Sequence, residues 1–346
     1  MNKLPEHQLS QVLGCLLAGA VGDALGAPVE FMNRSAIVCQ FGAGGIRNYA
    51  MAYGRLGAIT DDTQMTLFTA EGCLRTAGNA EDPMHAMRQA YQRWLLTQGV
   101  RGDAVPDQTG WLIQQKALFS RRAPGNTCLS ALQRTGGEIN HSKGCGGIMR
   151  VAPCGIVHAG APEKAFQLGL AAARLTHGHP TGYLAAAVFA TLIAELITGT
   201  TLPDAIHTAR CLLVLAPDHH ETLAALDAAV HRAANNELPE TAIPALGEGW
   251  IAEEALAIAV YCALQAPNLE EGIITAVNIT GDSDSTGAIT GNLLGAMYGA
   301  LAIPVRWLES LELRDVIEVM AGDLALSSRL HLTPMRPVDR QRYPLE

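Results

Sequence analysis

Two segments of the chain place carboxylates and hydroxyls directly ahead of predicted apolar helices. One reads Ile59-Thr60-Asp61-Asp62-Thr63-Gln64-Met65, and the other reads Ile279-Thr280-Gly281-Asp282-Ser283-Asp284-Ser285-Thr286-Gly287. At the start of a helix, Ser, Thr and Asp side chains accept hydrogen bonds from free N–H groups, and the helix dipole favours acids. Capping explains either segment taken alone, but a cap needs only one side-chain oxygen. Each segment supplies two acids within three residues, so capping leaves carboxylates unexplained.

Four carboxylates that converge in a helical core repel one another unless cations neutralise them. Hard divalent cations take oxygen ligands and are the natural partners of such a site. A calcium loop is one possible form, because Asp282-x-Asp284-x-Thr286-Gly287 has the spacing of its first half. The twelfth position of that loop requires a bidentate Glu, but Leu293 stands there inside a predicted helix. The sequence therefore predicts a divalent metal site of another kind.

The elements that position these acids are predicted to be helices. Apolar residues recur at i, i+3 and i+4 through most of the chain, and no stretch alternates convincingly over strand length. Gly and Pro clusters separate the helices, without a linker, repeat or charge shift that would divide the chain. We therefore predict an all-α protein with one compact multi-helix domain over residues 1–346 and a tail after about residue 330. The predicted helices are Leu9–Leu25, Asp62–Arg75, Pro83–Thr97, Pro162–Leu175, Thr181–Thr198, Leu202–Leu215, His220–Ala234, Ala252–Leu264, Leu269–Asn278 and Ser285–Leu301.

Small residues recur every four positions on one face of two predicted helices. Each Gly inside a helix costs about 0.5–1 kcal/mol relative to Ala, so such rows need a packing reason. We expect the backbone of another helix to approach these faces closely. The rows are Gly14, Ala18 and Gly22 near the start of the chain, and Gly287, Gly291, Gly295 and Gly299 near its end.

The composition limits the class of protein. The 346 residues are 49% hydrophobic and only 5% aromatic, with a formal net charge of −9. A chain this apolar buries a core and is not disordered, and its negative charge argues against a nucleic-acid partner. The longest uncharged apolar runs, Val12–Gly22 and Leu184–Ala194, are shorter than the roughly 20 residues of a membrane span. Eight cysteines without a C-x-x-C pair suit a reducing compartment, so we expect a cytoplasmic protein without a membrane segment.

Six motifs, in the same order, resemble those of the ADP-ribosylglycohydrolases. This family includes the dinitrogenase-reductase-activating glycohydrolases and the ADP-ribosylarginine hydrolases. The resemblance runs from about residue 9 to about residue 311. The motifs are Gly22-Asp23-Ala24-Leu25-Gly26 with Glu30, Thr60-Asp61-Asp62-Thr63, Gly125-Asn126-Thr127, Gly144-Cys145-Gly146-Gly147-Ile148-Met149-Arg150, Arg174-Leu175-Thr176-His177-Gly178-His179-Pro180 and Gly281-Asp282-Ser283-Asp284-Ser285-Thr286-Gly287.

The resemblance implies an all-α domain with two Mg²⁺ ions, or Mn²⁺ in their place, below a cleft for ADP-ribose. The reaction would hydrolyse the bond from the ribose anomeric carbon to a protein side chain, through an oxocarbenium-like transition state. A carboxylate would take the proton of the attacking water, and Glu30, Asp61 and Asp62 all remain candidates for this base. The metal ligands carried over from the family would be Thr60, Asp61, Asp62, Asp282, Asp284 and Ser285.

Other motif residues suit a ligand built on a pyrophosphate. Gly144-Cys145-Gly146-Gly147 is flexible enough to direct backbone N–H groups at an anion, although an ordinary tight loop has the same composition. The resemblance implies substrate contacts from Gly125, Asn126, Gly144, Cys145, Gly146, Gly147, His177 and His179. Some residues keep two interpretations. Arg150 and Arg174 either bind phosphate or support the fold, and Asp23 either supports the metal ligands or is a buried, hydrogen-bonded acid. Trp250 is either a platform for adenine or part of the core.

The expected function is removal of ADP-ribose from modified protein, with ADP-ribosylarginine as the favoured substrate. Arg122-Ala123-Pro124-Gly125 and Cys145 resemble the arginine branch, whereas Glu30 matches the bacterial glycohydrolases and the serine-directed branch. Ala123 stands where the dinitrogenase-reductase branch carries an Asp. A serine-linked or O-acetyl-ADP-ribose hydrolase and a catalytically silent ADP-ribose-binding or structural relative are the alternatives. The expected partners are ADP-ribose and an ADP-ribosylated protein, in regulation or in toxin immunity.

Overall fold

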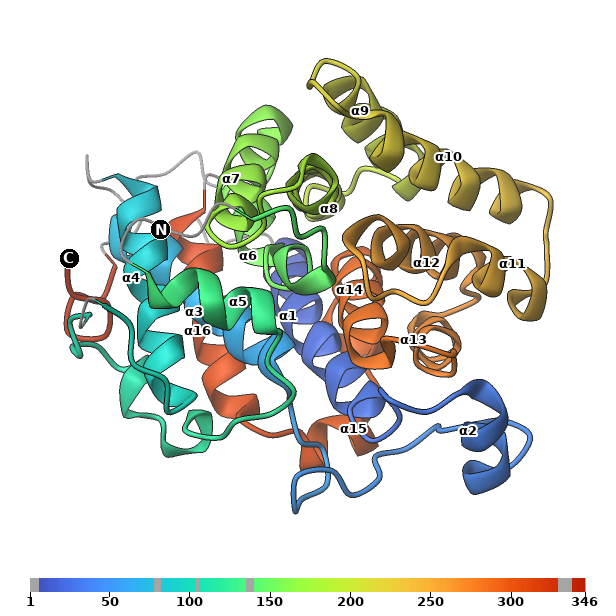
Figure 1. Cartoon of the computed structure of the whole chain (residues 1–346), viewed down its shortest axis with the longest axis horizontal. Coiled ribbons are helices and arrows are strands. Elements are labelled where there is room, and N and C mark those ends of the chain that lie inside the picture. Colours follow the sequence, from blue (N-terminus) through green and yellow to red (C-terminus); the bar gives the residue numbers. More distant parts are fainter. Residues whose placement is uncertain (1–5, 78–81, 104–105, 135–139, 329–337, 346) are drawn as a thin grey trace.

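The computed structural model describes residues 6–77, 82–103, 106–134, 140–328 and 338–345. Within these ranges it contains helices and turns but no strand, and Figure 1 shows the helices gathered around a central pair, so the all-α prediction is confirmed. The α-helices are α1 (Glu6–Gly26), α2 (Arg34–Phe41), α3 (Asp61–Thr76), α4 (Pro83–Thr97), α5 (Asn126–Gln133), α6 (Ala152–Val157), α7 (Pro162–Arg174), α8 (Pro180–Leu196), α9 (Leu202–Leu213), α10 (His220–Ala234), α11 (Pro239–Leu246), α12 (Ala252–Gln265), α13 (Leu269–Val277), α14 (Ser283–Tyr298), α15 (Val305–Ser310) and α16 (Arg314–Ser327).

All ten predicted helices are present, and each end agrees with the prediction to within one turn. One of the larger differences is at the end of α14, which stops at Tyr298 rather than at the predicted Leu301. Gly299 has a positive φ of 76° and caps this helix, donating its N–H to the Gly295 carbonyl at 2.9 Å. The helices that the periodicity missed are mainly short, and they include α11, which begins at Pro239.

The centre of the fold is the antiparallel contact between α1 and α14, the most extensive between any two helices (Figure 1). A Cβ added at Gly22 would lie 2.0 Å from the Gly287 carbonyl oxygen, and one at Gly14 would lie 2.4 Å from that of Gly295. The small residues therefore permit backbone contact, as their spacing predicts. At the end of α1, Gly26 meets the backbone of Asp284, which brings the end of α1 to the start of α14.

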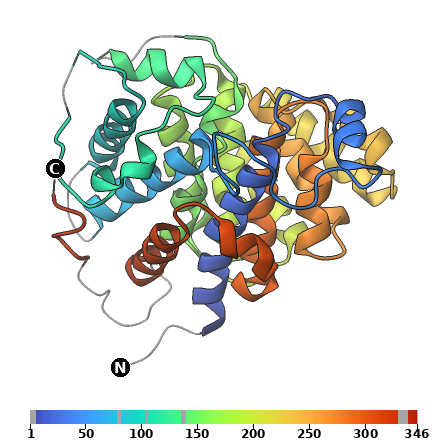
Figure 2. The same ribbon diagram turned by 90° about the horizontal axis from the view of Figure 1, so that it is seen from below.

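Helix α1 is long and apolar enough to cross a membrane by length and composition. However, 83% of its apolar window, which lies within His7–Gly26, is buried inside the fold. It packs against α14, α16 and α3, and Figure 2 shows the dark red α16 beside the blue α1. Its hydrophobicity is thus explained by the core that it forms. No other helix in the described ranges has this length and hydropathy.

The last described residues, 338–345, attach to the body of the protein. Tyr343 is fully buried, and its hydroxyl donates to the Asp323 carboxylate at 2.8 Å. Arg340 donates to the Arg75 carbonyl at 2.7 Å and to the Ala77 carbonyl at 2.8 Å, at the end of α3. The predicted tail therefore includes a segment that packs against α3 and α16.

Candidate functional site

The first acidic segment forms the start of α3. Thr60 is the N-cap, and Asp61 and Asp62 lie in the first turn with buried side chains. Behind them, Asp23 accepts hydrogen bonds from the Thr60 N–H at 3.0 Å, the Thr60 hydroxyl at 2.8 Å and the Thr63 N–H at 3.1 Å. Asp23 is therefore a buried, hydrogen-bonded acid of α1 that positions the start of α3.

The second acidic segment forms the start of α14. Asp282 is the N-cap and accepts a hydrogen bond from the Ser285 N–H at 3.3 Å. Asp284 accepts from the same N–H at 3.0 Å, and all three side chains are buried. Capping thus accounts for one oxygen of each carboxylate, and both residues also line a cavity at the end of α1.

Glu30 completes the cluster from the turn after α1. One oxygen each of Glu30, Asp282 and Asp284 lies within 4.8 Å of the others. Asp61 and Asp62 line the same cavity. Glu30 Oε2 and Asp62 Oδ1 are buried and have no hydrogen-bond partner among the described residues. Closely spaced carboxylate oxygens without donors form a ligand set that fits hard divalent cations.

Burial and mutual repulsion hold these acids toward their protonated forms. Burial, followed by repulsion from Asp284 and Asp282, raises the pKa of Glu30 to about 10. The same two causes raise the pKa values of Asp61, Asp62 and Asp282 well above the usual range of a carboxyl group, and burial raises the pKa of Asp284. A cation in the cluster would stabilise the charged carboxylates and reverse this effect.

A cavity of about 220 Å³ lies over the acids. On one side, the Gly125 N–H donates to Asp61 Oδ2 at 3.3 Å, and on another the Cys145 thiol lies 2.8 Å from Asp282 Oδ2. His177 is buried in the wall, and burial lowers its pKa to about 3, so the ring is neutral. The predicted site residues that line the cavity are Glu30, Asp61, Asp62, Gly125, Asn126, Gly144, Cys145, Gly146, His177, Asp282, Asp284 and Ser285.

Three other predicted site residues lie behind or beside the cavity wall. Thr60 is fully buried, with its hydroxyl 3.5 Å from Asp62 Oδ2. Gly147 packs toward Ala173, and a Cβ there would lie 3.2 Å from the Ala173 Cβ. His179 is the N-cap of α8, where its Nδ1 accepts from the Thr181 N–H at 3.2 Å. Their predicted ligand contacts stay predictions.

The glycine-rich loop has part of its backbone already engaged. The Gly144 N–H donates to the Ser142 hydroxyl at 3.3 Å, and the Cys145 N–H donates to the Trp250 carbonyl at 3.1 Å. These bonds position the loop beside the segment that precedes α12. An anion in the cavity would therefore depend more on the start of α5, where Gly125 and Asn126 line the wall, than on a full row of loop amides.

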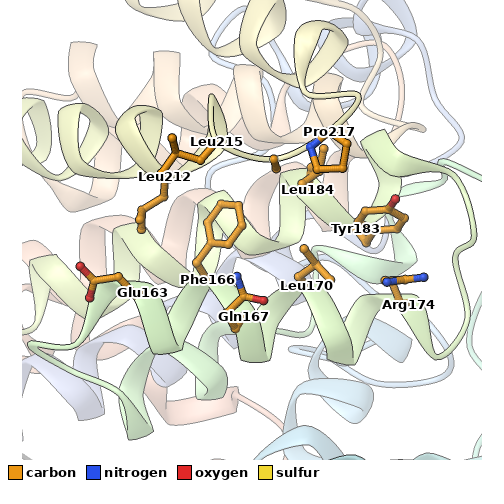
Figure 3. Close-up of a pocket in the computed structure, with 11 residues that line it drawn as sticks. Glu163, Phe166, Gln167, Leu170, Arg174, Tyr183, Leu184, Leu212, Leu215 and Pro217 are labelled. Carbon is orange, nitrogen blue, oxygen red and sulfur yellow. The ribbon is translucent and has the colours of Figure 1, made fainter.

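The two predicted arginines lie outside this cavity. Arg150 is buried and donates to the Gly146 carbonyl, the Ala172 carbonyl and the Thr176 hydroxyl at 2.7–3.0 Å, so it supports the fold of the wall. Arg174 lies over the Tyr183 ring, 5.0 Å from its centroid, at one end of a separate groove between α7 and the segment after α9 (Figure 3).

One pair that positions the site could not be found from sequence motifs. Arg122 and Glu312 form a buried ion pair. Arg122 donates to the Ile59 carbonyl at 2.8 Å, and Glu312 accepts from the Ile59 N–H at 3.1 Å. The Arg122 carbonyl also accepts from the Asp61 N–H at 3.3 Å. This pair therefore holds the chain that enters α3, but Glu312 lies outside every motif.

The sequence model of the ADP-ribosylglycohydrolase family matches residues 4–333. The chain belongs to this family. The ADP-ribosyl-[dinitrogen reductase] glycohydrolase of Rhodospirillum rubrum is 28% identical over 325 residues, which cover 89% of this chain and 92% of that protein. The ADP-ribosylarginine hydrolase Tri1 of Serratia proteamaculans is 25% identical over 338 residues, covering 93% and 81%. A solved structure, described as an ADP-ribosylglycohydrolase-related protein complex, matches with a TM-score of 0.69 and 30% identity, covering 93% of this chain and 99% of that one.

The family predicted from the six motifs is thus confirmed, and the match extends beyond both ends of the predicted range. ADP-ribosylglycohydrolases are hydrolases that act on ADP-ribosyl bonds and depend on divalent metal ions. In this member, the buried carboxylates under the cavity are the donor groups that fit such ions. The cavity is therefore the candidate active site of an ADP-ribosylglycohydrolase.

Proposed function

We propose that this ADP-ribosylglycohydrolase is a Mg²⁺-dependent enzyme that removes ADP-ribose from modified arginine side chains of proteins. The observation that carries the proposal is the convergence of five buried carboxylates beneath one cavity, two of them with unpartnered oxygens. A silent relative has no need of such a costly cluster, because burying unpaired acids destabilises a fold. Arginine is supported by the Tri1 relative and by the Arg122-Ala123-Pro124-Gly125 segment.

The residues that would hold two Mg²⁺ ions, or Mn²⁺, come from the starts of α3 and α14. When bound, the ions would neutralise the acids, orient ribose hydroxyls and lower the pKa of a nearby water. The positive ends of the two helix dipoles meet here, which lowers the cost of gathering the acids before an ion arrives. These ligands are Thr60, Asp61, Asp62, Asp282, Asp284 and Ser285.

Glu30 is the residue best placed to accept the proton of the attacking water. Its Oε2 is unpartnered and its side chain lines the cavity, whereas Asp61 Oδ2 already accepts from the Gly125 N–H. With its neighbours neutralised by cations, Glu30 ionises more readily than its pKa of about 10 in the metal-free protein indicates. Asp61 and Asp62 are the remaining candidates for the base.

The other cavity residues suit an anionic ligand with a sugar at its reacting end. Gly125 and Asn126 bring the N-terminal end of α5 into the wall, where the N–H groups of the first helical turn, from Asn126 onward, and the helix dipole favour phosphate. Neutral His177 is held by a 2.9 Å contact between its Nδ1 and the Thr176 hydroxyl, which orients its other nitrogen. His177 thus offers a fixed hydrogen-bonding group without adding charge.

The test offers three ADP-ribosylated substrates separately with Mg²⁺: arginine-linked peptide, serine-linked peptide and O-acetyl-ADP-ribose. We expect release of ADP-ribose from the arginine-linked peptide, and none from this peptide when EDTA removes the metal. Cleavage of the serine or acetyl linkage without the arginine linkage would contradict the proposed substrate. Tight ADP-ribose binding in calorimetry, with no turnover of any substrate, would show a binding protein instead.

We also propose that the protein works in the cytoplasm on an ADP-ribosylated protein, in regulation or in defence against an ADP-ribosylating toxin. The support is the cysteine chemistry: all eight cysteines are unpaired thiols, and five of them are buried. Unpaired thiols are typical of a reducing compartment. Fractionation of cells with an antibody against the protein tests the location.

A further inference from the structure

Two exposed aromatic rings stack on each other at the rim of the candidate active site. The Phe31 and Trp250 centroids lie 5.9 Å apart, and the ring planes differ by 15°. Phe31 is 76% exposed and Trp250 is 38% exposed, so the pair is not part of the core. Trp250 also lines the cavity above the acids, and Phe31 directly follows Glu30 in the chain.

The backbone that carries each ring is connected to the candidate active site. The Trp250 carbonyl accepts the Cys145 N–H at 3.1 Å, which joins the ring's backbone to the glycine-rich loop. Phe31 lies in the turn that places Glu30 within 4.8 Å of Asp282 and Asp284. Exposing large aromatic rings forfeits their hydrophobic stabilisation, so a stacked pair at a cavity rim indicates a surface kept for binding.

The charge around the pair favours a cationic ligand. The exposed acid Glu248 lies two residues before Trp250, in the loop that carries this ring. A guanidinium group stacks on aromatic faces and is attracted by nearby carboxylates, whereas a serine side chain gains from neither. The rim is therefore complementary to an arginine side chain.

We propose that Phe31 and Trp250 form the acceptor subsite, on which the guanidinium and stem of the modified arginine lie while its bond to ribose is cleaved. This inference rests on the proposed function, because it assumes an arginine-linked substrate. Phe31 directly follows Glu30, the group proposed to act at the reacting end of the ligand, and this position favours contact with the acceptor. It therefore determines specificity for arginine over neutral acceptors.

The experiment compares Phe31→Leu, Trp250→Leu and the double variant with the parent, all loaded with Mg²⁺. Two quantities are measured: kcat/KM for an arginine-linked peptide, and Kd for free ADP-ribose, which lacks the acceptor. We expect kcat/KM to fall about two- to five-fold for each ring and about ten-fold for the double variant, with Kd unchanged. Trp250→Phe, which keeps an aromatic face, should keep most of the parent's kcat/KM.

The matched control is Tyr298→Leu, which removes a 44% exposed ring at the opposite end of α14 and should change neither quantity. Weaker ADP-ribose binding in the Trp250 or Phe31 variants, by the same factor as kcat/KM, would overturn the inference and assign the rings to ADP-ribose itself. Unchanged kcat/KM and Kd would also overturn it. Failure of the parent to cleave the arginine linkage would instead contradict the proposed function.

Discussion

Glu30→Gln should stabilise the metal-free protein while it removes activity. In the folded protein burial and the neighbouring acids raise the pKa of Glu30 to about 10, against an ordinary value of 4.5. Above pH 4.5 the unfolded chain therefore releases a proton that the folded protein keeps. Unfolding is thus favoured progressively as the pH rises from 4.5 toward 10, and stability falls over that range. Gln has no proton to release, so the stability of the variant does not fall with pH for this reason.

The magnitude follows from the size of the pKa shift. At pH 8 the group lies about 3.5 pH units above its unfolded pKa, which corresponds to a loss of about 5 kcal/mol at 1.36 kcal/mol per unit. Neighbouring carboxylates share the protons of the cluster, so we expect a gain of about 2–5 kcal/mol in the variant. With an unfolding entropy of about 2.1 cal/mol/K per residue over 346 residues, this gain raises Tm by about 3–7 °C.

The assay is differential scanning calorimetry of EDTA-treated parent and Glu30→Gln protein from pH 5 to 8, repeated with Mg²⁺. The Tm difference should grow with pH in EDTA and shrink or reverse with Mg²⁺, which stabilises the intact cluster. Turnover should fall by about 10²–10⁴-fold, as expected for a general base. Glu309→Gln, which changes an exposed acid outside the cavity, is the control. A variant that melts no higher than the parent in EDTA, with the same pH slope, would refute the reasoning.

Three further changes test the cluster, its wall and the helix contact beneath it. Asp284→Ala should abolish turnover without lowering the Tm in EDTA. If Asp284 served only to cap the helix, the variant would instead lose about 0.5–2 kcal/mol in free energy of unfolding and keep its activity. Burial lowers the pKa of His177 to about 3, so below pH 6.5 the unfolded chain binds a proton that the folded protein does not. The free energy of unfolding of the parent should therefore fall by about 1.4 kcal/mol per pH unit below 6.5, relative to that of His177→Gln, as measured by urea unfolding. Gly287→Ala places a Cβ 2.6 Å from the Gly22 carbonyl oxygen and should cost about 1–3 kcal/mol in the same assay. Gly322→Ala, with open space around its Cβ, should instead be neutral or stabilising.

The sequence by itself determined the features that depend on neighbouring residues. Helix positions follow from apolar periodicity, and the acids at the starts of α3 and α14 follow from capping chemistry, because both signals act over one or two turns. The glycine rows also predicted a close helix contact, since only backbone approach explains their cost. The six motifs identified the family without any tertiary information.

Only the tertiary structure decided which of these residues meet. Glu30 reaches Asp282 and Asp284 because backbone contact along α1 and α14 places the end of one helix at the start of the other. In the connection between α7 and α8, His177 lies in the cavity wall, whereas His179 is a helix cap. Glu312 pairs with Arg122 across 190 positions of the chain, and no local pattern marks either contact. Such pairings depend on how whole helices pack, and packing is a property of surfaces assembled from distant parts of the chain.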